Sequence, residues 1–226
     1  MLDSHRDLAA IERETGVFFV APKRIAETLA GFDRFAAGRG ARRWVEKTPD
    51  HLLHFETLRV HCPRHPVILM LRDDRDLVAS LKARFEDFSQ AVETWQRSAR
   101  VAAELLERGR DPFLFPLCHE RLVEAPERVL RRLCRHLGLS FDPAMLGFHR
   151  TPRHWYSSST EKPAGVSQQY HPQNRNWQIN QPLFDPRRRW QRDLTAEETS
   201  RLEQGETGKL LQRMERARHR ILEREK

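Results

Sequence analysis

The chain has little that would place it in a membrane or stabilise it by disulfide bonds. None of its apolar stretches approaches the length of a membrane-spanning helix, and its N-terminus has no apolar signal-peptide core. Its three cysteines, Cys62, Cys118 and Cys134, are odd in number and widely spaced, which argues against a disulfide scaffold and a Cys-x-x-Cys metal site. We therefore expect a soluble chain in a reducing, cytoplasmic compartment.

The sequence also lacks the patterns typical of nucleic-acid-binding proteins, although it is strongly basic. It carries 40 Lys and Arg against 32 Asp and Glu, a net charge of +8. Zinc-finger cysteine spacing, an aromatic RNA-binding signature and a heptad-plus-basic region are all absent, so a nucleic-acid partner would rest on charge alone. The charge favours an anionic ligand or partner, and we do not expect that partner to be nucleic acid.

Strand and helix patterns alternate along the first two thirds of the chain. Short apolar runs predict strands at 43–47, 67–71 and 113–120, the last weakened by Pro116, which indicates an edge strand or a bulge. Helical spacing predicts helices at 51–60, 91–108 and 125–137. This order is typical of right-handed parallel crossovers. The predicted fold class is therefore α/β, with a parallel sheet flanked by helices.

The last third of the chain has a different composition. Residues 150–185 are rich in His, Ser, Gln, Asn and Pro and have little periodicity, which indicates a long irregular loop such as a lid or a binding loop. The capping-box pattern that begins at Thr195 predicts a final helix over 195–226. The length of 226 residues and the absence of an internal repeat favour a single domain over 1–226.

The stretch from Val67 to Ser80 combines a buried strand with the start of a helix. The apolar run ends at Arg72, Asp73 or Asp74 stands where a helix N-cap is expected, and Ser80 follows about two turns later. Ligands of open parallel sheets bind outside the carboxyl ends of the strands, and a cation there beside helix amides and a hydroxyl suits a phosphate. The alternative is a capped helix with surface ion pairs.

Two further residues are candidates for chemistry. Glu14 stands just before the apolar run at 17–20, where partial burial would raise its pKa as a general base requires, although a solvated loop acid is the alternative. Lys47 lies at the end of a predicted strand, shortly before Pro49, and its alternative role is a surface ion pair with Glu46.

Taken in order, these segments resemble sulfotransferases that use 3′-phosphoadenosine 5′-phosphosulfate (PAPS), and most closely the bacterial and tyrosylprotein-type branch. Arg72 with Ser80 resembles the 3′-phosphate motif of that family. The other matching segments are Met1 to Asp7, Glu14-Thr15 with Phe18-Phe19, Glu46-Lys47-Thr48-Pro49, His119 to Val123 with Pro126 and Leu137-Gly138-Leu139, and Arg189-Trp190 with Leu194-Thr195. The resemblance implies a P-loop nucleoside-kinase-like fold.

The resemblance also implies a role for each matched residue. Arg72 and Ser80 would hold the 3′-phosphate, and Arg189 would contact the nucleotide phosphates. Glu14 would accept the acceptor's proton, with Glu12 as its competitor, and Lys47 would lie near the acceptor or the transferring group. No metal is required. The expected partners are PAPS, its product 3′,5′-ADP and an acceptor that the sequence does not identify.

Three features depart from the family pattern. The "SGTT"-like phosphosulfate loop is absent, and the alignment would place its strand and loop before Met1. His119 stands where the family usually has a tyrosine that helps to bind PAPS, and Cys118 where an arginine is frequent. We therefore keep three hypotheses: a PAPS-dependent sulfotransferase or a truncated form of one, a non-catalytic anion-binding or interaction module with the same fold, and a nucleic-acid-binding protein.

Overall fold

The computed structural model describes residues 25–109, 111–155, 157–185 and 187–224. The chain divides after Arg64 into two compact units, each described here by itself. The prediction of a single domain over 1–226 stays a prediction.

The first unit consists of helices and an extended segment. Helix α2 spans Ile25–Gly38, the 3-10 helix η2 spans Pro49–His54, and α3 spans Phe55–His61. The strand expected at 43–47 is wrong, because a strand needs a neighbour to complete its backbone hydrogen bonds and none of the described residues pairs with it. Its Trp44 instead stacks on Phe32 of α2 at 4.7 Å between ring centroids, and the Trp44 Nε1 donates to Asp33 Oδ1 at 2.9 Å.

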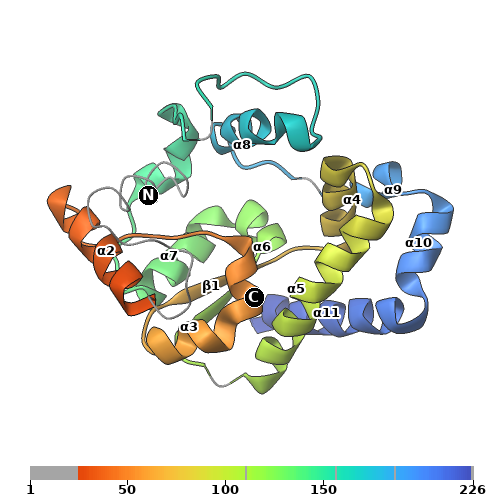
Figure 1. Ribbon diagram of the computed structural model, residues 1–226, viewed down its shortest axis with the longest axis horizontal. Coiled ribbons are helices and arrows are strands. Elements are labelled where there is room, and N and C mark those ends of the chain that lie inside the picture. Colours follow the sequence, from red (N-terminus) through yellow and green to blue (C-terminus); the bar gives the residue numbers. More distant parts are fainter. Residues whose placement is uncertain (1–24, 110, 156, 186, 225–226) are drawn as a thin grey trace. The chain divides into compact units, whose positions relative to one another are not determined.

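The second unit is built around two parallel strands. Strand β1 (Val67–Leu71) pairs in parallel with β2 (Leu114–Cys118), in a register that sets Val67 opposite Leu114. Between them run α4 (Asp74–Phe85) and α5 (Phe88–Arg108), which pack against each other (Figure 1). The α/β class with parallel strands flanked by helices is confirmed, and β2, which contains Pro116, is an edge strand of the described sheet.

The remaining elements of the second unit follow β2. They are α6 (His119–Glu124), α7 (Pro126–His136), the 3-10 helices η3 (Pro143–Arg150) and η4 (Gln168–Tyr170), α8 (His171–Ile179), α9 (Trp190–Asp193), α10 (Ala196–Glu203) and α11 (Gly205–Arg224). Helix α7 packs on β2, with Val129 against Phe115 and Leu117. Helix α11 packs on β2 and α5 (Figure 1).

The apolar residues predicted to be buried form the core of this unit. Trp95 is 1% exposed and Cys134 is 4% exposed, as the helical spacing predicted. On the shared face of the two strands, Phe115 and Leu117 are buried, whereas Ile68 and Met70 of β1 are 38% and 52% exposed. All three cysteines are buried, and none of them forms a disulfide bond within the described residues.

The segment 150–185 is less irregular than predicted, because it contains α8. Asn176 is completely buried and its Nδ2 donates to the Ser159 carbonyl at 2.7 Å. Asn180 accepts from the Arg153 N–H and donates to the Arg153 carbonyl, at 2.7 and 2.8 Å. These asparagine contacts tie α8 to the preceding chain, and hydrophobic periodicity does not report polar contacts of this kind.

The helix expected over 195–226 is two helices. The capping box at Thr195 and Glu198 is present, as predicted, but α10 ends at Glu203 and α11 begins at Gly205 with a φ of +57°. A Cβ at Gly208 would overlap the backbone carbonyl of Glu203, so the close approach of the two helices requires glycine there. After this corner α11 packs against α10 and α5.

Candidate functional site

The candidate site lies where β1 ends and α4 begins. The apolar strand ends at Leu71, and Asp73 caps α4: its carboxylate accepts from the N–H groups of Arg75 and Asp76 at 3.0 and 3.3 Å. An aspartate that accepts hydrogen bonds from the first-turn amides is a strong helix start signal, so the sequence itself places this junction. Arg72 is therefore the one residue between the end of β1 and the cap of α4.

Arg72 is a largely buried cation with unused donors. Its side chain is 24% exposed, and its buried Nε and Nη2 have no hydrogen-bond partner among the described residues. The carboxylate of Asp76 lies 3.9 Å from Nη2, close enough for an ion pair but too far for a hydrogen bond. Burial is the main reason that the pKa of Arg72 is lowered; Arg189 acts in the same direction, and nearby carboxylates oppose it. Buried donors of this kind favour an anionic ligand.

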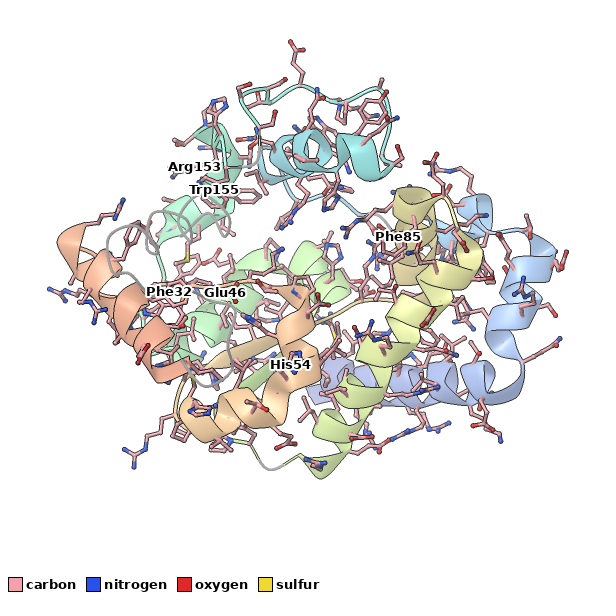
Figure 2. All side chains as sticks on the ribbon, in the orientation of Figure 1. Phe32, Glu46, His54, Phe85, Arg153 and Trp155 are labelled. Atoms are coloured by element: carbon pink, nitrogen blue, oxygen red, sulfur yellow. The ribbon has the colours of Figure 1, made fainter. Side chains whose placement is uncertain are left out.

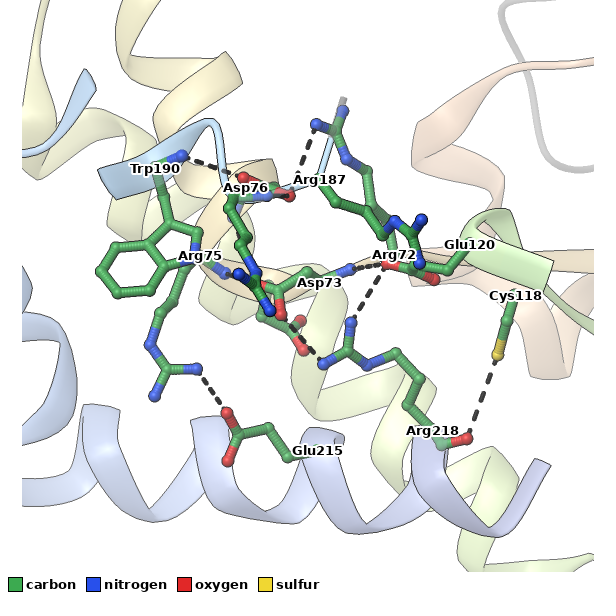
Figure 3. Close-up of polar contacts among 12 residues, drawn as sticks. Arg72, Asp73, Arg75, Asp76, Cys118, Glu120, Arg187, Trp190, Glu215 and Arg218 are labelled. Carbon is green, nitrogen blue, oxygen red and sulfur yellow. Dashed lines mark hydrogen bonds and ion pairs between the residues drawn. The ribbon is translucent and has the colours of Figure 1, made fainter. Parts of the chain in front are cut away.

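A buried ionic network fixes the backbone beside Arg72 (Figure 3). Glu120 Oε1 accepts from the N–H of Asp73 at 2.7 Å and from Arg218 Nη1 at 3.1 Å. Arg218 Nη2 donates to Asp73 Oδ2 at 3.0 Å. The end of β1 is therefore held by α6 and by α11, which come from well separated parts of the sequence.

The arginine-rich turn at 187–189 lies on the other side of Asp76. The two carboxylate oxygens of Asp76 accept from the N–H groups of Arg188 and Trp190, at 3.1 and 2.9 Å (Figure 3). The Arg189 side chain pairs with Asp193 one turn later. Since the charge of Arg189 lowers the pKa of Arg72, the two guanidinium groups lie within electrostatic reach of each other. The structure thus brings together two arginines that the sequence assigned to one nucleotide.

His119 and Ser80 belong to the same region. His119 is the first residue of α6, directly after β2, and its pKa is lowered mainly by burial and then by the positive charge of Arg72. A lowered pKa keeps the imidazole neutral at pH 7, so His119 offers a hydrogen bond to a ligand rather than a charge. Ser80 is half-buried in the second turn of α4.

Lys47 lies in the first unit. In the extended segment around Lys47, Glu46 (labelled in Figure 2) accepts from Thr48 Oγ1 at 2.5 Å and pairs with His51 Nδ1 at 2.7 Å. Burial by itself raises the pKa of Glu46, but its hydrogen bonds with His51 and Thr48 outweigh burial, so the pKa is lowered. The hydrogen bond between Glu46 and His51 also raises the pKa of His51. Lys47 itself is exposed. Glu14 and its competitor Glu12 lie outside the described residues.

A cavity of about 850 Å³ adjoins the site but does not include Arg72. Its lining contains Asp73, Asp76 and Glu120 together with Arg188 and Arg218. Because Arg218 is already paired with Asp73 and Glu120, and Asp76 accepts from backbone N–H groups, the cavity wall attracts an anion less strongly than the Arg72 donors that lack partners among the described residues. We therefore centre the candidate site on Arg72 and not on the cavity.

Sequence reasoning missed Asp76 and Arg218. Asp76 lies inside the stretch that was singled out, but its spacing there fits an ordinary exposed helix charge. Arg218 lies 145 positions after its partner Asp73, and no local pattern links the two. Among the described residues no cluster of metal-ligating side chains is found, and no helix is long and apolar enough to cross a membrane.

Two comparisons with known proteins bear on this site. Residues 2–143 match the sequence profile of the Sulfotransferase family. Among solved structures, the chain is similar to a sulfotransferase domain from the curacin biosynthetic pathway, with 15% sequence identity over 89% of this chain and 80% of that one and a TM-score of 0.49. Since the structural likeness is slight, the assignment rests on the sequence match, which spans the whole β1 to α7 region.

Proposed function

The chain belongs to the sulfotransferase family, and from that premise we propose that it moves a sulfuryl group from PAPS to a hydroxyl or amine acceptor. Sulfuryl transfer passes an SO₃-like group in line between two heteroatoms, so catalysis depends mainly on positioning and on charge stabilisation, as in phosphoryl transfer. A site of this kind needs fixed cations for the donor's phosphates and a base for the acceptor's proton.

The observation that carries the proposal is the buried Arg72 guanidinium, with two donor nitrogens that lack partners among the described residues. A 3′-phosphate offers acceptor oxygens to both of those donors and a charge that offsets the cost of burying the cation. The α4 amides contribute less than the sequence suggested, because the Asp73 carboxylate already accepts from those of Arg75 and Asp76. Arg72 therefore supplies most of the attraction for the anion, whereas the Arg189 guanidinium already pairs with Asp193.

The other roles in the proposal follow the resemblance. Ser80 and His119 complete the nucleotide site with Arg72, and Arg189 contacts the nucleotide phosphates. Glu14 accepts the acceptor's proton, and Lys47 lies near the acceptor or the transferring group. No step requires a metal ion. The partners are PAPS and an acceptor of unspecified structure, and a cytoplasmic location suits the three free cysteines.

Thermal unfolding of the 226-residue chain with nucleotides tests the proposal. We expect 3′,5′-ADP to raise the melting temperature more than 5′-AMP does, because only the former carries a 3′-phosphate and binding to the native state stabilises it. Arg72→Ala should remove the difference between the two nucleotides, whereas Arg216→Ala, at an exposed arginine of α11, should preserve it. The absence of any shift with 3′,5′-ADP in the unaltered chain would overturn the proposal.

A second measurement separates binding from transfer. We expect Glu14→Gln to bind 3′,5′-ADP as the unaltered chain does while its turnover of PAPS to 3′,5′-ADP falls, since the base is lost but the phosphate site is not. If the unaltered chain binds 3′,5′-ADP yet does not turn over PAPS with any hydroxyl or amine probe, the non-catalytic anion-binding module is the better description.

A further inference from the structure

Asp76 is a buried carboxylate, and both of its oxygens accept hydrogen bonds from the arginine-rich turn at 187–189 and the residue that follows it. Its side chain is 1% exposed. One oxygen accepts from the Arg188 N–H at 3.1 Å and the other from the Trp190 N–H at 2.9 Å. Hydrogen bonds to a charged acceptor are stronger than neutral ones, and a backbone N–H that loses such a bond inside the protein is costly. Asp76 therefore holds the 187–189 turn by its backbone.

The turn that Asp76 holds has a strained backbone. Arg188 has a φ of +63°, a left-handed conformation that residues with a Cβ rarely adopt. Such a conformation persists only where the surrounding structure enforces it. The backbone N–H groups of Arg188 and Trp190 both donate to Asp76, so Arg189 lies between two amides that Asp76 holds in place.

The same carboxylate faces Arg72. Its Oδ2 lies 3.9 Å from Arg72 Nη2, and Arg189 lies close enough to lower the pKa of Arg72. Two guanidinium groups at this range repel each other, and a buried negative charge between Arg72 and the turn offsets that repulsion. Since the Asp76 contact is too long to be a hydrogen bond, it offsets the charge of Arg72 while leaving its donors available.

From this geometry we propose that Asp76 is a positioning residue for the nucleotide: it holds the arginine-rich turn so that Arg189 and Arg72 face the same 3′-phosphate. The inference rests on the proposed function, because it assumes that Arg72 binds that phosphate. The Asp76 carboxylate is the specific cause of the turn's position. Without it, the Arg188 N–H would lose its acceptor and Arg188 would relax from the left-handed to an ordinary backbone conformation.

The test uses Asp76→Asn, which keeps the shape of the side chain and one acceptor oxygen but loses the charge and the second acceptor. We expect the Kd for 3′,5′-ADP, measured by isothermal titration, to rise about tenfold, the effect of losing one charge-assisted hydrogen bond. The Kd for 5′-AMP should stay within about twofold. Tryptic cleavage after Arg187, Arg188 and Arg189, followed by mass spectrometry without nucleotide, should become faster.

A double-mutant cycle with Arg188→Gly separates positioning from general destabilisation. Glycine adopts the left-handed conformation without strain, so the turn should depend less on Asp76 when position 188 is glycine. In the Arg188→Gly background, Asp76→Asn should therefore raise the Kd for 3′,5′-ADP by only about threefold. Val129→Ala, which opens a cavity between α7 and β2, is the matched control and should change neither the Kd nor the cleavage of the turn.

The outcomes distinguish the inference from the function on which it rests. If the unaltered chain does not bind 3′,5′-ADP, the proposed function fails first. If it binds and Asp76→Asn binds equally well, the function stands and the positioning role is overturned. Hydrogen exchange covers the case in which Asp76→Asn does not fold: in the unaltered chain the Trp190 amide should be protected, and more so with 3′,5′-ADP. An unprotected Trp190 amide also overturns the inference.

Discussion

Arg218 Nη2 lies 3.0 Å from Asp73 Oδ2, so the last helix of the chain is bonded directly to the N-cap of α4. The Nη1 atom of the same guanidinium lies 3.1 Å from Glu120 Oε1. The Arg218 side chain is only 10% exposed, and the two carboxylates are 24% and 11% exposed. One buried cation therefore neutralises two acids beside the candidate site.

Replacing Arg218 should destabilise the chain strongly. Arg218→Met leaves Asp73 and Glu120 buried without their cation, and breaking a buried ionic network in this way costs on the order of 3 kcal/mol. Urea unfolding followed by circular dichroism measures the loss. Arg216→Met, an exposed position on the same helix, is the control and should change the free energy of unfolding by less than about 0.5 kcal/mol. Equal losses in the two variants would contradict the role of Arg218.

Replacing Asp74 should stabilise the chain at neutral and alkaline pH. Burial raises the pKa of Asp74 to about 7, although the hydrogen bond from Trp95 and the charge of Arg218 act to lower it. In the unfolded chain the carboxyl ionises near its ordinary value of 3.8, so between these two pKa values the folded state holds the extra proton. Stability attributable to this group therefore falls as pH rises from about 4 to about 7 and stays low above it.

Asp74→Asn removes this titration and keeps an acceptor for Trp95 Nε1, which donates to Asp74 Oδ1 at 2.7 Å. We expect the free energy of unfolding at pH 8 to rise by on the order of 2–4 kcal/mol, with little change at pH 4. Chemical denaturation at both pH values measures the difference. Glu197→Gln, at an exposed acid of α10, should show no comparable gain; a destabilised Asp74→Asn at pH 8 would refute the expectation.

Replacing Gly208 should open the corner between α10 and α11. Gly208→Ala places a methyl group on the backbone carbonyl of Glu203, and because α11 is packed on α4, α5 and α10 we expect a loss of about 2 kcal/mol. Gly205→Ala meets no atom within 4 Å but has to adopt a φ of +57°, which costs about 1 kcal/mol. The melting temperature of Gly208→Ala should therefore lie below that of Gly205→Ala. The reverse order would mean that the close approach of Gly208 to Glu203 does not fix the turn between α10 and α11.

Much of the fold was predictable because it depends on local patterns. The apolar run of β1, the Asp73 cap, the spacing of Trp95 in α5 and the capping box at Thr195 each act within a few residues, so their physical effect is written in adjacent sequence. The predictions failed where packing between elements decided the outcome. The 43–47 segment packs Trp44 on α2, and the chain turns at Gly205, where Gly208 comes close to Glu203.

The sequence alone determined the junction of β1 and α4, with Arg72 at the strand end, because an apolar run followed by an aspartate cap has one local solution. The sequence alone also indicated the family, because short family motifs follow one another in the expected order. Only the tertiary structure decided what surrounds Arg72: the carboxylates of Asp76 and Glu120, the turn at Arg189 and the cation of Arg218. The pairing of Arg218 with Asp73 spans 145 positions. Pairings of this kind follow from how helices pack around the strands, which no neighbouring residue encodes.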